Sequence, residues 1–460
     1  VSDIAATYFG EFDPVELNNG PVGVGLGAVV LRSTRWDNYK GAVTWMSTAD
    51  GSLNNGLKGG VISNSNSLVG AAANDYVGNA SYDGVTLLAN RANYLVHSSM
   101  GGLGALTWVN GATGLTHNGA GTITTANSLM GAAGDAVGSS TVTTLLGNNN
   151  VVLTNTFWGG GYGSVTWMNG VTGQLKGGAL GGLVSAANSL VGTSASDQIG
   201  SAGILPVSTG DYFVSSPHWA NGAALDAGAV TLGNGANGAT IGAISATNSL
   251  VGTGTGDAVG WSVMPIGGTR YLVASPQWGS NGVASNALGA ITWIDAANNK
   301  VGPVSASNSL VGSNPGDIAG GSLNSGWIYS VKSNGNLIIQ SPDWNGGRSA
   351  LTWMNGATGA LSNGSFGGAI SASNSLLGSN PGDKLGQGDI YELANGNWVI
   401  ASPYWGYGAN QTSGYGLGAA TWINGSTGRL ADSTSGGMLT AANSLVGNVT
   451  GDAVGGLGNC

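Results

Sequence analysis

The sequence predicts an all-β protein, a seven-bladed β-propeller with four antiparallel strands per blade. Each unit contains four short runs of strand-forming residues, and no stretch shows the 3.6-residue apolar period of a helix. Four strands repeated seven times is the pattern of such a propeller. The motif Asn-Ser-Leu-Val-Gly, with Met or Leu for Val in two copies, occurs seven times at spacings of 61, 61, 60, 60, 66 and 69 residues. It starts at Asn66, Asn127, Asn188, Asn248, Asn308, Asn374 and Asn443.

The four runs have distinct signatures. The first is short and leads into a turn such as Asn395-Gly396, which favours a tight hairpin. The second ends in Ser-Pro-x-Trp, where proline suits a strand end because no ladder donor is needed there. The third reads Gly-Ala-Val-Thr-Trp and closes in a second turn such as Asn110-Gly111. The fourth, Val-Ser-Ala-x-Asn-Ser-Leu-Val, is predicted as one strand, for example over 184–191, and precedes a Gly-Asp connector.

Residues 1–20 are predicted to be a leader that adds a cap or an extra strand. The seven-repeat propeller then takes 21–460, with units at approximately 21–78, 83–138, 141–200, 202–260, 261–320, 327–386 and 389–455. The leader or the residues after Asp452 would close the ring. A β-solenoid and an open array of β modules are the competing architectures, but solenoid coils are usually shorter and a lone unit has little core.

The composition fits a turn-rich folded protein. Charged residues make up 7% of the 460, hydrophobic residues 42%, and glycine 86 of 460, about 19%. The net charge of −9 and the lack of any Lys/Arg cluster argue against nucleic acid or an anionic membrane as a partner. No apolar run reaches the roughly 18 residues of a membrane span. One cysteine, Cys460, cannot staple the fold.

An aspartate follows each copy of the motif. As a calcium ligand it would be poorly supported, because calcium takes six to eight oxygens and each connector offers one carboxylate. We therefore predict a structural role, in which the carboxylate accepts backbone amides of a turn or of the neighbouring blade, and no metal site. The structural repeat residues are Asp75, Asp135, Asp197, Asp257, Asp317, Asp383 and Asp452.

Two tryptophan series recur. The Thr-Trp series is predicted to be core between blades, and Leu232 replaces Trp in the fourth unit. The Ser-Pro-x-Trp series precedes a variable loop near a blade edge, where aromatic rings can stack on sugars. Packing is the commoner fate of tryptophan, so both interpretations stay open. The candidate ligand-binding residues are Trp36, Trp158, Trp219, Trp278, Trp344 and Trp405.

No catalytic motif is present. His97, His117 and His218 fall at different positions of different units, and the sequence holds no nucleophile elbow, zinc motif or phosphate-binding loop. We predict no catalytic residues and no cofactor, with a carbohydrate-active hydrolase as the alternative.

The unit consensus resembles repeats of large secreted bacterial proteins of the filamentous-haemagglutinin-like or adhesin-like type. Its elements are Gly-Ala-Val-Thr-Trp-x-Asn-Gly-x-Thr-Gly, Ser-Ala-x-Asn-Ser-Leu-Val-Gly and Gly-Asp-x-Val-Gly. The resemblance implies propeller blades in an exported protein and transfers no ligand or catalytic residue. It agrees with a composition rich in Gly, Asn, Ser and Thr and poor in Lys, which suits an extracellular or cell-surface bacterial protein.

Two hypotheses of function follow. The first is a non-catalytic extracellular binding or adhesion module, lectin-like, that contacts glycans or cell-surface polymers through variable loops and blade-edge tryptophans. The second is a structural subunit that self-associates into an extracellular filament, sheath or matrix. Loops that differ between units favour recognition, because function concentrates where a scaffold varies.

Overall fold

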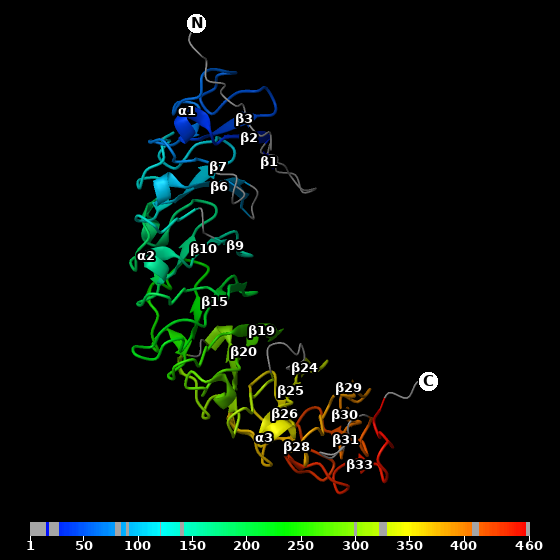
Figure 1. The fold of residues 1–460 in the computed structure, drawn as a ribbon. Coiled ribbons are helices and arrows are strands. Elements are labelled where there is room, and N and C mark those ends of the chain that lie inside the picture. Colours follow the sequence, from blue (N-terminus) through cyan, green and yellow to red (C-terminus); the bar gives the residue numbers. More distant parts are fainter. Residues whose placement is uncertain are drawn as a thin grey trace. The chain divides into compact units, whose positions relative to one another are not determined.

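The structure is a computed structural model that describes residues 15–17, 27–78, 84–88, 92–119, 121–138, 142–298, 301–321, 329–406 and 414–456 (Figure 1). Cys460 and most of the predicted leader lie outside these residues. The described chain forms seven β-sheets, one after another along the sequence, each with four or five strands. The prediction of an all-β fold with seven four-stranded repeat sheets, as in the blades of a seven-bladed propeller, is confirmed; the individual sheets are open.

The strands of the first three sheets, in spatial order, are as follows. The first sheet has β1 (Val15–Leu17), β2 (Ala28–Ser33), β3 (Ala42–Ser47) and β4 (Leu68–Val69). The second has β5 (Val85–Leu87), β6 (Asn93–Ser98), β7 (Ala105–Asn110), β8 (Ser128–Met130) and β12 (Gly182–Leu183). The third has β9 (Val142–Leu145), β10 (Val151–Asn155), β11 (Ser164–Met168), β13 (Ser189–Val191) and β17 (Gly242–Ala243).

The other four sheets repeat this order. The fourth has β14 (Ile204–Pro206), β15 (Tyr212–Ser216), β16 (Ala229–Gly233), β18 (Ser249–Val251) and β22 (Gly302–Pro303). The fifth has β19 (Ser262–Gly267), β20 (Arg270–Ser275), β21 (Ala290–Asp295), β23 (Leu310–Val311) and β27 (Gly368–Ala369). The sixth has β24 (Tyr329–Val331), β25 (Leu337–Ser341), β26 (Ala350–Met354), β28 (Leu376–Leu377) and β32 (Gly437–Met438). The seventh has β29 (Asp389–Glu392), β30 (Trp398–Ser402), β31 (Ala419–Ile423) and β33 (Leu445–Val446).

Helix is confined to single turns. α1 (Trp36–Tyr39), α2 (Trp158–Gly161) and α3 (Trp344–Gly347) each begin at a tryptophan of the Ser-Pro-x-Trp series. The 3-10 turns are η2 (Met100–Gly102), η3 (Lys176–Gly178), η4 (Ala284–Asn286) and η5 (Ala296–Asn298). No helix among the described residues has the length and apolar character needed to cross a membrane.

The fourth run of each unit differs from the prediction. The predicted single strand over 184–191 is divided: β12 pairs in parallel with β8 of the preceding sheet, and only β13 joins its own sheet. The same division recurs where β17, β22, β27 and β32 pair with β13, β18, β23 and β28. Five sheets therefore gain a parallel fifth strand from the following repeat. Two residues are too few to give a strand signal in sequence, and the prediction of a single strand over 184–191 is wrong. The four strands that each repeat places in its own sheet are antiparallel, as predicted.

The leader contributes to the first sheet. β1 pairs antiparallel with β2, with Val15 opposite Val30 and Leu17 opposite Ala28. The segment therefore occupies the place that β5 has in the second sheet. Of the two predicted roles, the extra strand is the one that the backbone shows.

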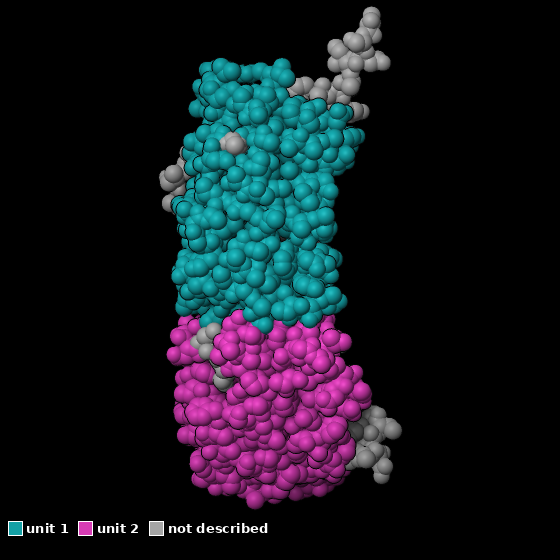
Figure 2. All heavy atoms as spheres, turned by 90° about the vertical axis from the view of Figure 1, so that its left-hand side faces the viewer, with its two compact units in different colours: residues 1–214, 231–244 teal, residues 215–230, 245–460 magenta. Residues whose placement is uncertain are grey.

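The described chain divides into two compact units, shown in teal and magenta in Figure 2. Unit 1 comprises Val1–Val214 with Thr231–Ile244, and unit 2 comprises Ser215–Val230 with Ser245–Cys460. Each unit has its own hydrophobic clusters, and each cluster lies between consecutive sheets.

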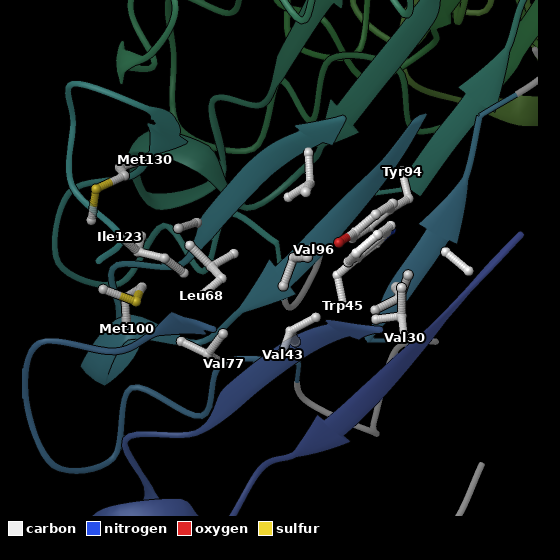
Figure 3. Close-up of a cluster of buried hydrophobic side chains, with 14 residues drawn as sticks. Val30, Val43, Trp45, Leu68, Val77, Tyr94, Val96, Met100, Ile123 and Met130 are labelled. Atoms are coloured by element: carbon white, nitrogen blue, oxygen red, sulfur yellow. The ribbon is translucent and has the colours of Figure 1, made fainter. Parts of the chain in front are cut away.

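In unit 1, one cluster joins the first and second sheets. Val43, Trp45 and Leu68 of the first sheet pack with Tyr94 and Val96 of the second (Figure 3). A second cluster joins the second sheet to the third, with Trp108 and Leu129 against Leu153 and Met168. The inner strands are consequently buried on both faces, and all six residues of β6 are buried. Clusters in unit 2 join the fifth sheet to the sixth and the sixth to the seventh in the same way.

Candidate functional site

The repeat aspartates sit in the connectors, and in four of them the carboxylate joins two repeats. One oxygen of Asp317 accepts the backbone N–H groups of Ser313 and Asn314, both at 2.7 Å, inside its own connector. The other accepts the backbone N–H of Asn345 in the next repeat at 2.7 Å. The same inter-repeat bond joins Asp135 to Gly159, Asp257 to Gly279 and Asp383 to Gly406, at 2.8–3.0 Å.

The other three repeat aspartates also accept backbone amides within their connectors. The carboxylate of Asp75 accepts the backbone N–H of Ala72, and that of Asp197 accepts the N–H groups of Thr193 and Ser194. The carboxylate of Asp452 accepts the N–H groups of Asn448 and Val449. Burial raises the pKa of the Asp383 carboxyl, although three backbone amides and Arg348 oppose that change. In the exposed Asp452, the amides of Val449 and Asn448 lower the pKa. Protein donors occupy these carboxylates, and the described residues contain no cluster of three or more His, Cys, Asp or Glu side chains that could hold a metal ion.

The Asn-Ser pair of the motif anchors the turn before the fourth strand. Asn66 Oδ1 accepts the backbone N–H of Ser63 at 2.9 Å, and its Nδ2 donates to the carbonyl of Val61 at 2.9 Å. The Ser67 hydroxyl donates to Asn66 Oδ1 and lies 2.7 Å from the hydroxyl of Thr44 in the third strand. Five further repeats show the same Thr–Ser pair at 2.6–2.7 Å: Thr107–Ser128, Thr166–Ser189, Thr292–Ser309, Thr352–Ser375 and Thr421–Ser444.

The Thr-Trp tryptophans lie between consecutive sheets. The indole N–H of Trp45 donates to the carbonyl of Gly111, in the Asn-Gly turn of the next repeat, at 2.7 Å. The corresponding bonds run from Trp108 to Gly170, Trp167 to Gly235, Trp293 to Gly356 and Trp353 to Gly425, at 2.9–3.2 Å. Each of these indoles is therefore hydrogen-bonded to a backbone carbonyl of the neighbouring repeat. The repeated tryptophan thus has a structural role.

A glycine four residues after the turn asparagine leaves room for the tryptophan ring. A Cβ on Gly114 would lie 2.4 Å from Trp45 Cβ, and Gly173, Gly238, Gly359 and Gly428 stand in the same relation to the tryptophan of the preceding repeat. All five glycines have positive φ, between 63° and 76°. The sequence shows this glycine as the last residue of Asn-Gly-x-Thr-Gly, with Asn237 in place of Thr before Gly238. Only the structure shows that the glycine leaves room for a tryptophan ring.

The six Ser-Pro-x-Trp tryptophans are buried or half-buried. Trp219 and Trp344 are buried, and Trp36, Trp158, Trp278 and Trp405 are half-buried. Trp344 is only 7% exposed, lies in the cluster between the fifth and sixth sheets, and donates its indole N–H to Ser313 Oγ at 2.9 Å. Trp158 and Trp405 pack on the corresponding clusters. These positions favour the packing interpretation over the sugar-stacking one.

The three histidines stay apart from one another. His97 is buried, with Nδ1 2.9 Å from the Gly138 carbonyl and Nε2 3.0 Å from Thr86 Oγ1. His117 stacks on Trp108 at 4.3 Å between ring centroids, and burial lowers its pKa. His218 lies 3.0 Å from Asp226 on the surface.

A connector position that sequence reasoning missed is the residue after each repeat aspartate. It adopts positive φ, from 42° to 52°, in all seven repeats, at Tyr76, Ala136, Gln198, Ala258, Ile318, Lys384 and Ala453. Such a conformation is unusual for non-glycine residues and worst for a β-branched one such as Ile318. Residue type at this position varies from repeat to repeat, so the sequence carries no signal for it.

An exposed aromatic corner lies where one of these connectors meets the loop of the next repeat. The rings of Tyr404 and Tyr415 approach to 5.3 Å between centroids, tilted by 34°. Lys384 Nζ lies 5.0 Å from the centroid of the Tyr404 ring, an arrangement typical of a cation–π contact. Tyr415 is 46% exposed. We call Lys384, Tyr404 and Tyr415 the tyrosine corner.

A small pocket lies in unit 1. It has a volume of about 100 Å³ and lies between the first and second repeats, lined by polar and small residues including Asn54, Asn64 and Thr116. Its size suits a few water molecules rather than a drug-sized ligand, for which sites are several-fold larger.

The fold and these contacts define a tandem-repeat β protein whose repeats are joined by recurring side-chain-to-backbone bonds. The chain belongs to the family described as "Repeat of unknown function (DUF5650)", whose model matches it seven times, at residues 25–79, 88–139, 145–201, 206–261, 266–321, 331–387 and 392–456. The family match supports the tandem-repeat part of the predicted resemblance. The adhesin-like part stays a prediction.

No curated protein matches the chain significantly. Among solved structures, it is similar to a chain titled "Dihydro-heme d1 dehydrogenase NirN in complex with DHE", at 12% identity and a TM-score of 0.28, covering 92% of this chain and 64% of that one. It is also similar to the tricorn protease, at 12% identity and a TM-score of 0.22, covering 86% of this chain and 29% of that one. The chain thus spans less than two thirds of either structure.

Proposed function

We propose that the chain is a non-catalytic extracellular binding module of a bacterial cell surface, in which stacked repeat sheets support recognition by residues that differ between repeats. One observation supports this most. The repeated Asp, Asn, Ser, Thr and Trp side chains are engaged in bonds within and between repeats. The residues left to contact a ligand are those that vary, as expected when function is carried by loops on a rigid scaffold.

The tyrosine corner is the part of the described surface best suited to this role. Tyrosine combines a flat apolar face with a polar hydroxyl and loses little conformational entropy on binding, which makes it a common contact for sugars and peptides. Lys384 adds a positive charge beside the rings, so we propose a glycan with an acidic group as the ligand. The predicted blade-edge tryptophans would then support the loops, as Trp405 packs against the cluster between the sixth and seventh sheets.

The test compares two tyrosines of similar exposure. Tyr415→Ala removes one ring of the corner, while Tyr391→Ala removes a 42% exposed ring from β29 outside it. On an array of acidic and neutral glycans, the wild type and the Tyr391 variant should bind the same acidic sugars, and the Tyr415 variant should lose that binding. Equal binding by both variants would refute the proposal for this corner.

A structural subunit of an extracellular filament, sheath or matrix is the second candidate. Its support is the composition, because few charged side chains (7% of the chain) and 86 glycines favour close packing of subunits. A hydrolase has less support, because the histidines lie apart and the described acidic residues form no cluster.

A further inference from the structure

The loop between β2 and β3, which contains α1, has a backbone conformation that is unusual for its residues (Figure 1). Three consecutive non-glycine residues in it, Asp37, Asn38 and Tyr39, have positive φ values of 46°, 56° and 63°. Aspartate and asparagine enter the left-handed region more readily than other non-glycine residues, whereas a tyrosine there is uncommon. The loop therefore holds Tyr39 in a conformation that its side chain disfavours.

Other repeats form the same loop with glycine at the position of Tyr39. A recurring backbone bond identifies this position, and in the first repeat it runs from the N–H of Gly41 to the carbonyl of Trp36. Its counterparts join Gly104 to Ser99, Gly163 to Trp158 and Ser349 to Trp344. The residues at the position of Tyr39 are then glycines with φ between 81° and 99°, namely Gly102, Gly161 and Gly347. A glycine would satisfy this backbone, so the loop conformation does not explain the tyrosine. Residues held in disfavoured conformations are found preferentially at functional sites.

The positions of Asn38 and Tyr39 are open to solvent in other repeats as well. A Cβ at any of the corresponding glycines of the second and sixth repeats would meet nothing within 4 Å, although each of these repeats follows another. These glycines are Gly101, Gly102, Gly346 and Gly347. In the first repeat Asn38 is exposed, and Tyr39 is 44% exposed. The exposure is therefore a property of the loop itself.

The ring of Tyr39 lies beside a second tyrosine ring, from the connector of the same repeat. The centroids of the Tyr39 and Tyr76 rings are 5.4 Å apart, and the rings are tilted by 41°. The backbone fixes this pair, because the N–H of Tyr76 donates to the carbonyl of Tyr39 at 2.8 Å. The N–H of Asn74 also donates to the carbonyl of Asn38, at 3.3 Å. Groups that are fixed before a ligand arrives lose less conformational entropy when it binds.

Polar side chains adjoin the rings. The Asp37 side chain is 43% exposed, and its Oδ2 lies 2.7 Å from Lys40 Nζ. Because the charge of Asp37 is paired with that of Lys40, this pair offers no excess positive charge to an anionic ligand. The Asn38 side chain adds an amide, which can both donate and accept hydrogen bonds. A carboxylate and an amide beside a tyrosine suit a ligand that has hydroxyl groups and an apolar face.

We propose that Asp37, Asn38, Tyr39 and Tyr76 form a binding site for a neutral sugar. The Tyr39 ring stacks against the apolar face of the sugar, and Asp37 and Asn38 form hydrogen bonds with its hydroxyl groups. We call these four residues the Tyr39 site. It belongs to unit 1, whereas the tyrosine corner belongs to unit 2 and has Lys384 for an acidic group. The two proposals therefore stand or fall separately.

Three variants test the Tyr39 site. Tyr39→Gly removes the ring and supplies the residue that the second, third and sixth repeats have at this position. Asn149→Gly is the matched control, because it replaces an exposed left-handed residue, with φ of 69°, in the turn between β9 and β10. Tyr415→Ala removes a ring of the tyrosine corner and leaves the Tyr39 site intact. Binding is measured on an array of neutral hexose oligosaccharides that also carries acidic glycans and a lysine-rich peptide, and stability by urea unfolding.

The wild type, the Asn149 variant and the Tyr415 variant should bind the same neutral oligosaccharide, and Tyr39→Gly should lose that binding. Tyr39→Gly should also unfold at the same urea concentration as the wild type or at a higher one, because glycine adopts the left-handed conformation without strain. A wild type that binds acidic glycans but no neutral oligosaccharide overturns the Tyr39 site alone, and the reverse result refutes the tyrosine corner alone.

Other results also contradict the Tyr39 site. Binding of only the lysine-rich peptide would assign the site to a different class of ligand. Binding that survives in Tyr39→Gly, or that is lost in the Asn149 or Tyr415 variant as well, would show that the sugar does not depend specifically on this loop. A lower urea midpoint for Tyr39→Gly would show that the tyrosine is retained for packing, and would overturn the inference.

Discussion

Replacing Gly114 by alanine tests whether the glycine after the turn is needed to leave room for the tryptophan ring of the preceding repeat. The added Cβ would lie 2.4 Å from Trp45 Cβ and 2.5 Å from Cγ, whereas carbon atoms in contact prefer about 3.5–4.0 Å. The ring or the turn must therefore move by roughly 1 Å or more. Overpacking of this kind costs about 1–3 kcal/mol, and an L residue in the left-handed region adds about 1–2 kcal/mol.

Gly51→Ala is the matched control. Its φ of 72° is close to the 68° of Gly114, so the backbone penalty is shared, but its Cβ meets no atom within 4 Å. We expect Gly51→Ala to cost about 1–2 kcal/mol and Gly114→Ala about 2–5 kcal/mol.

The assay is urea unfolding, supplemented by hydrogen exchange of the Trp45 indole N–H, which should exchange faster only in the Gly114 variant. Repeat arrays can lose stability locally. The exchange rate of the Trp45 N–H therefore shows whether the stability is lost at the interface between the first and second repeats. Equal stability of the two variants, with an unchanged Trp45, would show that the turn glycine does not seat the ring.

Three further predictions follow from the same contacts. Trp344→Ala should cost about 3–5 kcal/mol as a core deletion, measured by denaturation; an unchanged stability would return Trp344 to the ligand-platform interpretation. Asp317→Asn should destabilise by about 1.5–3 kcal/mol, because hydrogen bonds to a charged acceptor are replaced. Asp452→Asn should have a smaller effect in the same assay, since Asp452 is exposed and has no following repeat in the described chain; equal losses would contradict the inter-repeat role. Asp50 should titrate with a pKa of about 2, because the Ser52 hydroxyl and amide donate to its carboxylate. Its folded pKa is depressed, so its stabilising contribution is present above 3.8 and lost as pH falls through 2. Carboxyl titration by NMR checks this value, and Ser52→Ala should raise it.

The sequence predicted those features that a repeated side chain or turn determines. The Thr-Trp and Asn-Ser-Leu signatures place the third strand and the end of the fourth run correctly, because alternating apolar residues and Asn-Gly turns act locally. The Ser-Pro-x-Trp motif does not determine whether the Trp344 ring points into the core or to the surface. In the structure the ring is buried.

Other features depend on contacts between repeats, which one unit of sequence does not contain. The Gly182–Leu183 strand is only two residues long and pairs with a preceding sheet. The positive φ at Ile318 follows from how the connector is held, not from the residue itself. Leu445 belongs to the same motif as Leu376, yet Leu445 is 70% exposed and Leu376 is 2% exposed.

The central claim is that five repeats are each joined to the next by a tryptophan that donates to the turn of the following repeat. Hydrogen exchange of the indole N–H groups in dilute protein tests it most directly. Trp45, Trp108, Trp167, Trp293 and Trp353 donate to Gly111, Gly170, Gly235, Gly356 and Gly425, and should exchange slowly. Fast exchange of all five would contradict the account.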